Sequence, residues 1–165
     1  MPRLEDVLRP IVGKPAWQVR RGSGSFLTLE FGEPHLEVRE PRIPRGETSV
    51  RVRQNFQKRR ITVVGHWHFW VQYSEWTVVT QNHESSSEDT DVEKIDSCLS
   101  ELDGQILLEV VENKKAASCE FKFDLGGTLT IFPSAEFPDH DLWTIHPIGS
   151  PVFAYRRTGI VVDSE

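Results

Sequence analysis

The feature that most constrains the fold of this chain is an internal repeat with an offset of 91 residues. The segment "VLRPIVGKPAW" begins at Val7, and "CLSELDGQIL" begins at Cys98. Their alignment pairs three residues of each segment, namely Leu8, Ile11 and Gly13 with Leu99, Leu102 and Gly104. Residues 26–38 and 119–131 then both read as strand, glycine turn and strand, and "GHWHFW" resembles "DHDLWTI". Because the order of elements agrees along both parts, we predict two halves of similar fold.

Each half is expected to begin with a short helix. Apolar residues recur at helical spacing in both: Leu4, Val7, Leu8 and Ile11 in the first, and Val92, Ile95, Leu99 and Leu102 in the second. Pro10 predicts a distorted last turn in the first helix, near residues 2–12. In the second, Thr90 and Glu93 fit a capping box, and Gly104 fits a C-terminal cap.

The remainder of each half predicts about five strands. "SFLTLEF" and "CEFKFDL" alternate with period two, and "RRGSGS", "LGGTL" and "RRTGIVV" are typical of hairpin turns. We therefore predict a mainly β, α+β protein with two short helices. Its two helix-plus-meander halves form a pseudo-two-fold sandwich or a pair of packed sheets.

The expected organisation is a single domain, residues 1–165, with halves at about 1–80 and 92–165. The linker between them, residues 81–91, is rich in serine and acids, so we expect it to be mobile rather than packed. A second irregular segment, residues 40–50, is punctuated by proline and glycine and predicts a loop.

Charge is segregated along the chain. Residues 39–60 hold eight Lys or Arg against two acids, and residues 84–103 hold eight Asp or Glu against one Lys. We interpret the basic run at residues 51–60 as a solvated edge strand. Nucleic-acid binding is not expected, because one Phe interrupts this run and the whole chain has a net charge of −6.

The stretch "GHWHFWVQYSEW" holds three of the five tryptophans and two of the six histidines. On a strand, His66 and His68 share one face, and such a pair can hold a metal ion if a third ligand joins it. His35, His83, His140 and His146 are the available third ligands, and we name His140 with the pair as the candidate set. We nevertheless predict no metal and no other cofactor, and we interpret the tryptophans mainly as core residues.

Several observations bear on class and location. The chain has no apolar run long enough for a membrane span and no signal-like leader, so we expect a cytoplasmic protein that does not contact a membrane. Cys98 and Cys119 have no metal-binding spacing, and two reduced thiols are the default expectation. No catalytic motif is present, and the acid–histidine cluster "DHD" at residues 139–141 predicts a loop, a pattern that a catalytic loop would share.

The segments "GSGSFLTLEFG", "LDGQ", "FDLGGTL" and "LWTI" resemble stretches of small bacterial proteins of the immunity-protein type. That resemblance implies a protein-binding role in which a toxin is neutralised by occlusion. Our main hypothesis is accordingly a non-enzymatic protein-binding module whose partner has a basic surface. The predicted contact residues are acidic: Glu84, Glu88, Asp89, Asp91 and Glu93.

Two alternative functions belong to other classes. One is a metal-dependent or small-ligand enzyme centred on His66 and His68, with Asp139, His140 or Asp141 as the further group. The other is a structural subunit of a larger bacterial complex that uses the charged run at residues 51–60.

Overall fold

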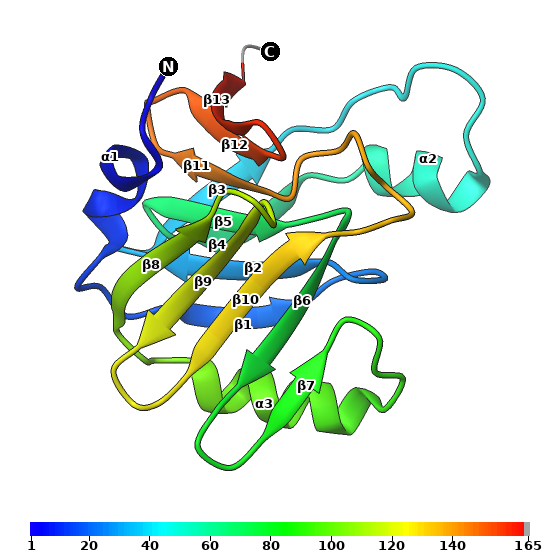
Figure 1. Ribbon diagram of the computed structural model, residues 1–165. Helices are drawn as coiled ribbons and strands as arrows, with labels where there is room; N and C mark the ends of the chain where they lie inside the picture. The colour runs from blue at the N-terminus through cyan, green and yellow to red at the C-terminus, as the bar shows by residue number, and fades with distance from the viewer. Residues whose placement is uncertain (164–165) are drawn as a thin grey trace.

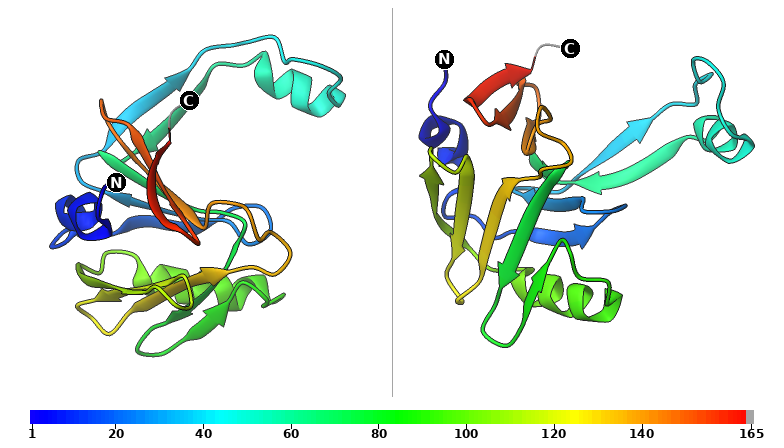
Figure 2. Two further views of the ribbon diagram at one scale, coloured as in Figure 1. Left: turned by 45° about the horizontal axis from the view of Figure 1, so that its top comes forward. Right: turned by 45° about the vertical axis from the view of Figure 1, so that its right-hand side comes forward.

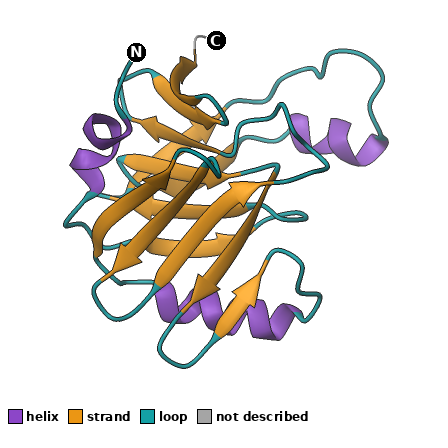
Figure 3. Cartoon of the chain, in the orientation of Figure 1, coloured by secondary structure: helices purple, strands orange, loops and turns teal. Residues whose placement is uncertain are grey.

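A computed structural model describes residues 1–163 of the chain as two β-sheets that pack face to face (Figure 1). The first sheet has the order β1 (Trp17–Arg21), β2 (Leu27–Phe31), β5 (Trp67–Val71), β11 (Trp143–Pro147), β12 (Val152–Arg156), β13 (Gly159–Asp163). The second has the order β7 (Glu84–Ser86), β6 (Ser74–Val79), β10 (Thr128–Pro133), β9 (Ser118–Phe123), β8 (Leu107–Asn113). Strands dominate the chain (Figure 3), and the predicted mainly β, α+β class is confirmed.

The two halves exchange strands between the sheets. The first half places β1, β2 and β5 in one sheet and then crosses to the other with β6 and β7. The second half does the reverse: β8, β9 and β10 share one sheet, and β11 and β12 cross to the first. Each sheet therefore contains strands from both halves, in equivalent order.

The backbone hydrogen bonds follow the 91-residue offset of the sequence repeat. Gly13 donates its N–H to Leu107 at 2.8 Å, and the equivalent Gly104 donates to Ala16 at 2.6 Å. Pro15 forms an isolated antiparallel bridge with Ile106, which is its own equivalent in the repeat. A residue can face its own equivalent only on a two-fold axis, so the pseudo-two-fold axis passes through this bridge.

One hydrophobic core fills the space between the sheets and takes side chains from both halves. Phe69 of β5 packs its ring on Phe121 of β9 and on Trp143 of β11, at centroid distances of 5.2 and 5.0 Å. Trp143 also stacks on Tyr155 at 5.3 Å. The interpretation of the tryptophans as core residues holds for Trp143 and for Trp76 of β6, whereas the other three are half-buried.

The helices differ from prediction in number and in one cap. Helix α1 (Leu4–Leu8) continues as the 3-10 turn η1 (Arg9–Ile11), as Pro10 predicted, and α3 (Val92–Leu102) is followed by Gly104 at φ +89°. The N-cap of α3 is Asp91, whose side chain accepts from two backbone N–H groups, so the capping box with Thr90 is wrong. A third helix, α2 (Val50–Phe56), lies where we predicted an edge strand.

The repeat alignment was wrong beyond β2. In the second half, residues 124–127 join β9 to β10 directly, whereas residues 32–66 separate β2 from β5 in the first half. These residues form β3 (His35–Arg39), helix α2 and β4 (Arg60–Val64), and β3 pairs only with β4. They are an insertion into the duplicated fold. Nor are "GHWHFW" and "DHDLWTI" equivalent, since β5 and β11 pair side by side in one sheet.

The predicted mobile linker is instead packed. Strand β7 pairs with β6 along Thr77–Ser86 and Val79–Glu84, and Ser85 is buried. Asp89 accepts hydrogen bonds from the Ser85 hydroxyl and the Ser86 N–H, each at 2.9 Å. The polar composition misled the prediction because these polar groups satisfy one another within the turn. In the described part of the chain, no helix is long and apolar enough to cross a membrane.

Candidate functional site

The inserted residues 35–64 form an arm that projects from the body of the molecule (Figure 2). It consists of β3, an irregular connection, α2 and β4, and both views show α2 at its far end. Val64, at the foot of the arm, is buried, but the continuous hydrophobic core has no member among residues 32–66. The arm is therefore not needed to form the core.

One face of the arm carries an exposed apolar strip. Leu36 pairs with Val63 and Val38 with Ile61, so all four side chains point to the same side of the two-stranded ribbon. Their exposed fractions are 63, 40, 49 and 61% in that order. An isolated two-stranded ribbon is marginally stable in water, so four exposed apolar side chains on such a ribbon indicate a surface to be covered.

Helix α2 extends the exposed apolar surface of the arm. Ser49 caps it by accepting the Val52 N–H at 3.2 Å, but none of its residues is buried. Val50 is 69% exposed, and Ile43, on the connection before the helix, is 92% exposed. A helix of a monomeric protein normally buries one face against its own core. This helix has no core beneath it, which indicates that its apolar residues serve contact with another molecule.

A cationic pocket of about 540 Å³ lies between α2 and the ends of the ribbon strands. Its lining holds four cations and one acid together with three uncharged residues: Arg39, Arg42, Lys58, Arg60, Glu40, Val52, Asn55 and Phe56. Arg42 stacks its guanidinium over the Phe56 ring at 4.6 Å. The backbone N–H of Arg42 donates to the backbone carbonyl of Phe56 at 2.8 Å.

Two of the arm's arginines are already neutralised by its own acids. Arg39 pairs with Glu37 and Arg59 with Glu40, both at 2.9 Å. Within residues 1–163, no carboxylate forms an ion pair with Arg42, Lys58 or Arg60. These three unpaired cations leave the pocket suited to an anionic group.

The foot of the arm is fixed to the body by close contacts. The Glu30 carboxylate on β2 is buried and accepts the Gly65 N–H at 2.9 Å. A Cβ on Gly65 would lie 2.5 Å from the carbonyl oxygen of Phe31, so only glycine fits there. Trp17 donates its indole N–H to the Gly32 carbonyl at 3.0 Å. The arm thus leaves the body in a defined direction.

The same Glu30 begins a row of polar side chains across three strands. Glu30, His68 and His146 face one another in register on β2, β5 and β11. His68 Nδ1 lies 2.5 Å from Glu30 Oε1, and the His68 and His146 rings are 5.8 Å apart. The contact with Glu30 orients the His68 ring through Nδ1, so that Nε2 points away from the carboxylate. This orientation suits a general base or a metal ligand.

The candidate metal ligands named from sequence do not come together. His66 lies against the Trp67 ring at 4.3 Å, whereas His140 lies against Tyr73 at 4.5 Å. Tyr73 lies beyond the end of β5 at Val71, so His140 contacts the chain past the end of the strand that carries His68. Among the described residues, no group of three or more His, Cys, Asp or Glu is arranged to hold a metal ion.

The predicted acidic contact residues lie on β7, the following turn and the start of α3. Four of them are exposed: Glu84, Glu88, Asp91 and Glu93. The carboxylate of Asp89 is instead engaged with Ser85, Ser86 and Lys94, and hydrogen bonding, first from the Ser86 backbone, holds its pKa below the usual range.

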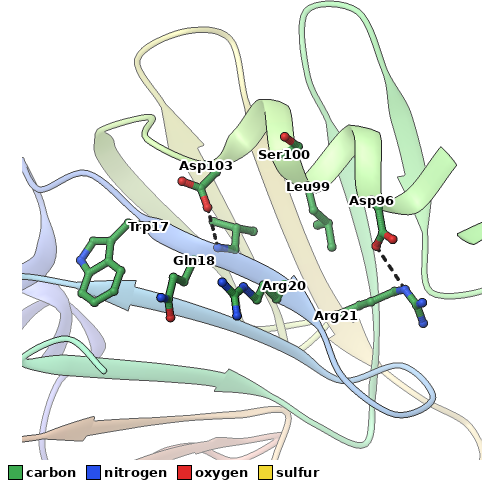
Figure 4. A pocket seen from close by; sticks show the side chains of 9 residues that line it. Trp17, Gln18, Arg20, Arg21, Asp96, Leu99, Ser100 and Asp103 are labelled. Atoms are coloured by element: carbon green, nitrogen blue, oxygen red, sulfur yellow. Dashed lines mark hydrogen bonds and ion pairs between the residues drawn. The ribbon is translucent and has the colours of Figure 1, made fainter. Parts of the chain in front are cut away.

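Helix α3 also borders an open groove of about 710 Å³ against β1 (Figure 4). Asp96 pairs with Arg21 at 3.2 Å, and Asp103 accepts the Val19 N–H at 2.9 Å. These carboxylates fasten the helix to the strand. The groove therefore offers no pair of groups arranged for acid–base chemistry.

Sequence reasoning identified only residues 51–60 of the arm as a site, and only in the alternative of a structural subunit. It predicted a loop at residues 40–50 and a charged strand at 51–60, and the latter is wrong because residues 50–56 are helical. One signal was available: "HLEVR" and "RITVV" both alternate with β-branched or leucine residues, which is typical of a hairpin. Alternation alone predicts that one face is buried, so it did not reveal that the apolar face is exposed.

Comparison with known proteins found no match to a family model, a curated protein or a solved structure.

Proposed function

We propose that the chain is a non-catalytic protein-binding module and that the arm, residues 35–64, is its docking element. The observation that carries this proposal is the exposed apolar strip on a ribbon that contributes nothing to the core. Contiguous exposed apolar surface rimmed by charge is typical of sites that bind another protein.

The strip cannot supply the affinity alone. Burying a whole Val, Leu or Ile side chain contributes roughly 1.5–3 kcal/mol, and these four are already about half buried, so covering them contributes about 4 kcal/mol. A micromolar complex requires about 8 kcal/mol after the costs of association. The exposed apolar residues of α2 and the unpaired cations must therefore join the contact.

The charge of the arm defines the partner's chemistry. Residues 35–64 hold eight Lys or Arg against three Asp or Glu, whereas the rest of the chain holds 11 against 22. The partner surface should combine an apolar patch with carboxylates that reach Arg42, Lys58 and Arg60. Association should be fast at low salt and slower at high salt.

The acidic residues predicted from sequence remain part of this proposal as a second surface, one suited to a basic partner. The resemblance to immunity proteins implies toxin neutralisation. In that case the basic partner of this second surface is the toxin. We propose the cytoplasm as the site of action, and the unpaired thiols of Cys98 and Cys119 support a reducing compartment.

The test uses tagged full-length protein to capture partners from a lysate of its own source cells. Ile61→Glu places a charge on the apolar strip, and Thr62→Glu places the same charge on the opposite face of the same strand as a matched control. We expect a stoichiometric acidic protein with the wild type and with Thr62→Glu, and its loss with Ile61→Glu. Equal capture by both variants, or capture of nucleic acid instead, would refute the arm as a protein-docking element.

A second candidate function, a metal-dependent or small-ligand enzyme, is favoured by one observation, the row Glu30, His68 and His146. This row is not itself a three-ligand metal group, so a metal ion there would need a further ligand from a substrate or solvent. A buried carboxylate that orients a histidine is the arrangement found behind metal ligands and general bases. Stoichiometric metal in the purified protein, lost when His68 and His146 are both changed to Ala, would support it. Metal content unaffected by that change would exclude this row as the site.

A further inference from the structure

We propose that the partner of the arm is a second copy of this chain. The basic arm of one copy would dock on the acidic surface that β7 and the N-terminal part of α3 form on another copy. This inference rests on the proposed function, since it names the molecule that covers the arm. It also accounts for both surfaces that the charge pattern of the sequence singled out.

The first argument is the complementarity of the two surfaces. The arm has a net charge of +5 from its Lys, Arg, Asp and Glu residues. The stretch of residues 84–103 has a net charge of −7, and Glu84, Glu88 and Glu93 within it are exposed, with no ion pair through their side chains among the described residues. Each surface therefore carries charges that its own copy does not neutralise.

The second argument is that the acidic surface also offers apolar area. Val79, which faces Glu84 across the β6–β7 pair, is 42% exposed, and Val92, the first residue of α3, is 45% exposed. Both surfaces therefore combine exposed apolar residues with charges, and the charges are of opposite sign. In the arm, Val50 and Ile61 lie among the cations. Apolar contact supplies affinity that charge alone does not supply in water.

The third argument is that one copy cannot satisfy its own arm. Figures 1 and 2 show α2 and α3 well apart in every view, with α2 at the far end of the arm and α3 beside β1 and β7 on the body. The foot of the arm is fixed by the Glu30–Gly65 hydrogen bond and by the close fit of Gly65. The arm therefore cannot fold back onto α3 of the same copy, and docking must be intermolecular.

The test is a charge exchange measured by sedimentation velocity. One variant reverses the arm, with Arg42→Glu, Lys58→Glu and Arg60→Glu. The other reverses the acidic surface, with Glu84→Lys, Glu88→Lys and Glu93→Lys. We expect the wild type to associate in a concentration-dependent way at about 0.02 M salt, with the apparent dissociation constant about tenfold higher at about 0.5 M salt.

Each variant alone should be monomeric, because the arm falls from +5 to −1 in one variant and residues 84–103 rise from −7 to −1 in the other, so the strong charge complementarity is lost in both. An equimolar mixture should associate again, since the unchanged basic arm of the body variant meets the unchanged acidic surface of the arm variant. A matched control with Glu5→Lys, Glu33→Lys and Glu136→Lys changes the net charge equally at exposed positions elsewhere and should associate as the wild type does.

Three results would overturn the inference: a wild type that stays monomeric at all concentrations, a mixture that stays monomeric, or body-reversed protein that associates like the wild type. None of these results would refute the proposal that the arm is a protein-docking element. Capture of a different protein that still depends on Ile61 would leave the arm as a docking element with another occupant.

Discussion

Removal of the arm should leave the duplicated fold intact. We consider a variant in which residues 32–66 are replaced by Asp-Leu-Gly, the three residues that separate the facing residues Phe123 and Gly127 in the second half. Phe31 and Trp67, the last pair of β2 and β5, would then be joined as their counterparts are. Because the core has no member within the removed segment, we expect the variant to fold.

The magnitude follows from what is lost and what is gained. The variant loses the Gly65–Glu30 hydrogen bond to a buried carboxylate, about 1.5–3 kcal/mol, and the Trp17–Gly32 hydrogen bond, about 0.5–1.5 kcal/mol. It also loses the burial of Val64, about 1–2 kcal/mol. It gains about 2 kcal/mol from closing a connection of about 3 residues rather than about 35. The expected net loss in the free energy of unfolding is about 1–4.5 kcal/mol.

The assay is urea unfolding followed by the fluorescence of Trp76 and Trp143, which are buried and lie outside the removed segment. Phe69→Ala in the intact chain serves as the benchmark, since emptying this core position should cost about 3–5 kcal/mol. If the arm-less variant loses more stability than Phe69→Ala, or unfolds without a cooperative transition, the arm is part of the folding unit and our reasoning is wrong.

Three further predictions concern the body of the molecule. Gly127→Ala should lower the free energy of unfolding by about 1–3 kcal/mol in urea melts, because its Cβ would lie 2.5 Å from side-chain atoms of both Gln105 and Leu102; an unchanged midpoint would contradict this overpacking. Hydrogen bonds, first from the Thr80 hydroxyl and then from His83, lower the pKa of Glu101 to about 2, so its stabilisation is complete above about pH 4.5 and is lost as the pH falls toward 2. Glu101→Gln should therefore flatten the acid limb of a plot of stability against pH, and an identical limb would refute the assignment. Burial raises the pKa of Cys119 to about 12 and also raises that of Cys98, so at about pH 8 a thiol reagent should label both only after unfolding; rapid labelling of the native protein would contradict their burial.

The repeat was predictable because its signals are local. Gly13 and Gly104 both adopt positive φ, at +85° and +89°, in the same turn after a short helix. A turn of this kind favours glycine at the left-handed position, so it can be recognised from the sequence. Helices α1 and α3 and most hairpins follow from the same kind of signal, since apolar periodicity, turn chemistry and alternation act over a few residues, whereas α2 was predicted as a strand.

Which sheet each strand joins after a turn was not predictable in this way. The crossing of β6 and β11 between sheets depends on pairing with strands that are far away in sequence, such as β6 with β10. Likewise, the alignment of β3 with β10 was wrong because both follow a strand and a glycine turn. Only sheet order distinguishes an inserted ribbon from a core strand.

The site shows the same limit. The histidine pair of "GHWHFW" drew attention to His68, but its partners Glu30 and His146 come from other strands, and no spacing in the sequence connects them. The acidic contact residues remain a prediction, which could be made because they lie within ten residues of one another in the sequence. Their exposure, and the use of Asp89 and Asp91 inside turns and caps, depended on the turn geometry.

The sequence by itself determined the composition of the two charged regions, the duplication and the local elements, because each is set by neighbouring residues. Only the tertiary structure decided that residues 35–64 stand outside the core and that Leu36, Val38, Ile61 and Val63 face outward. A strand with alternating apolar residues buries its apolar face only if another element packs against that face. Whether anything lies beside it is a property of the whole fold.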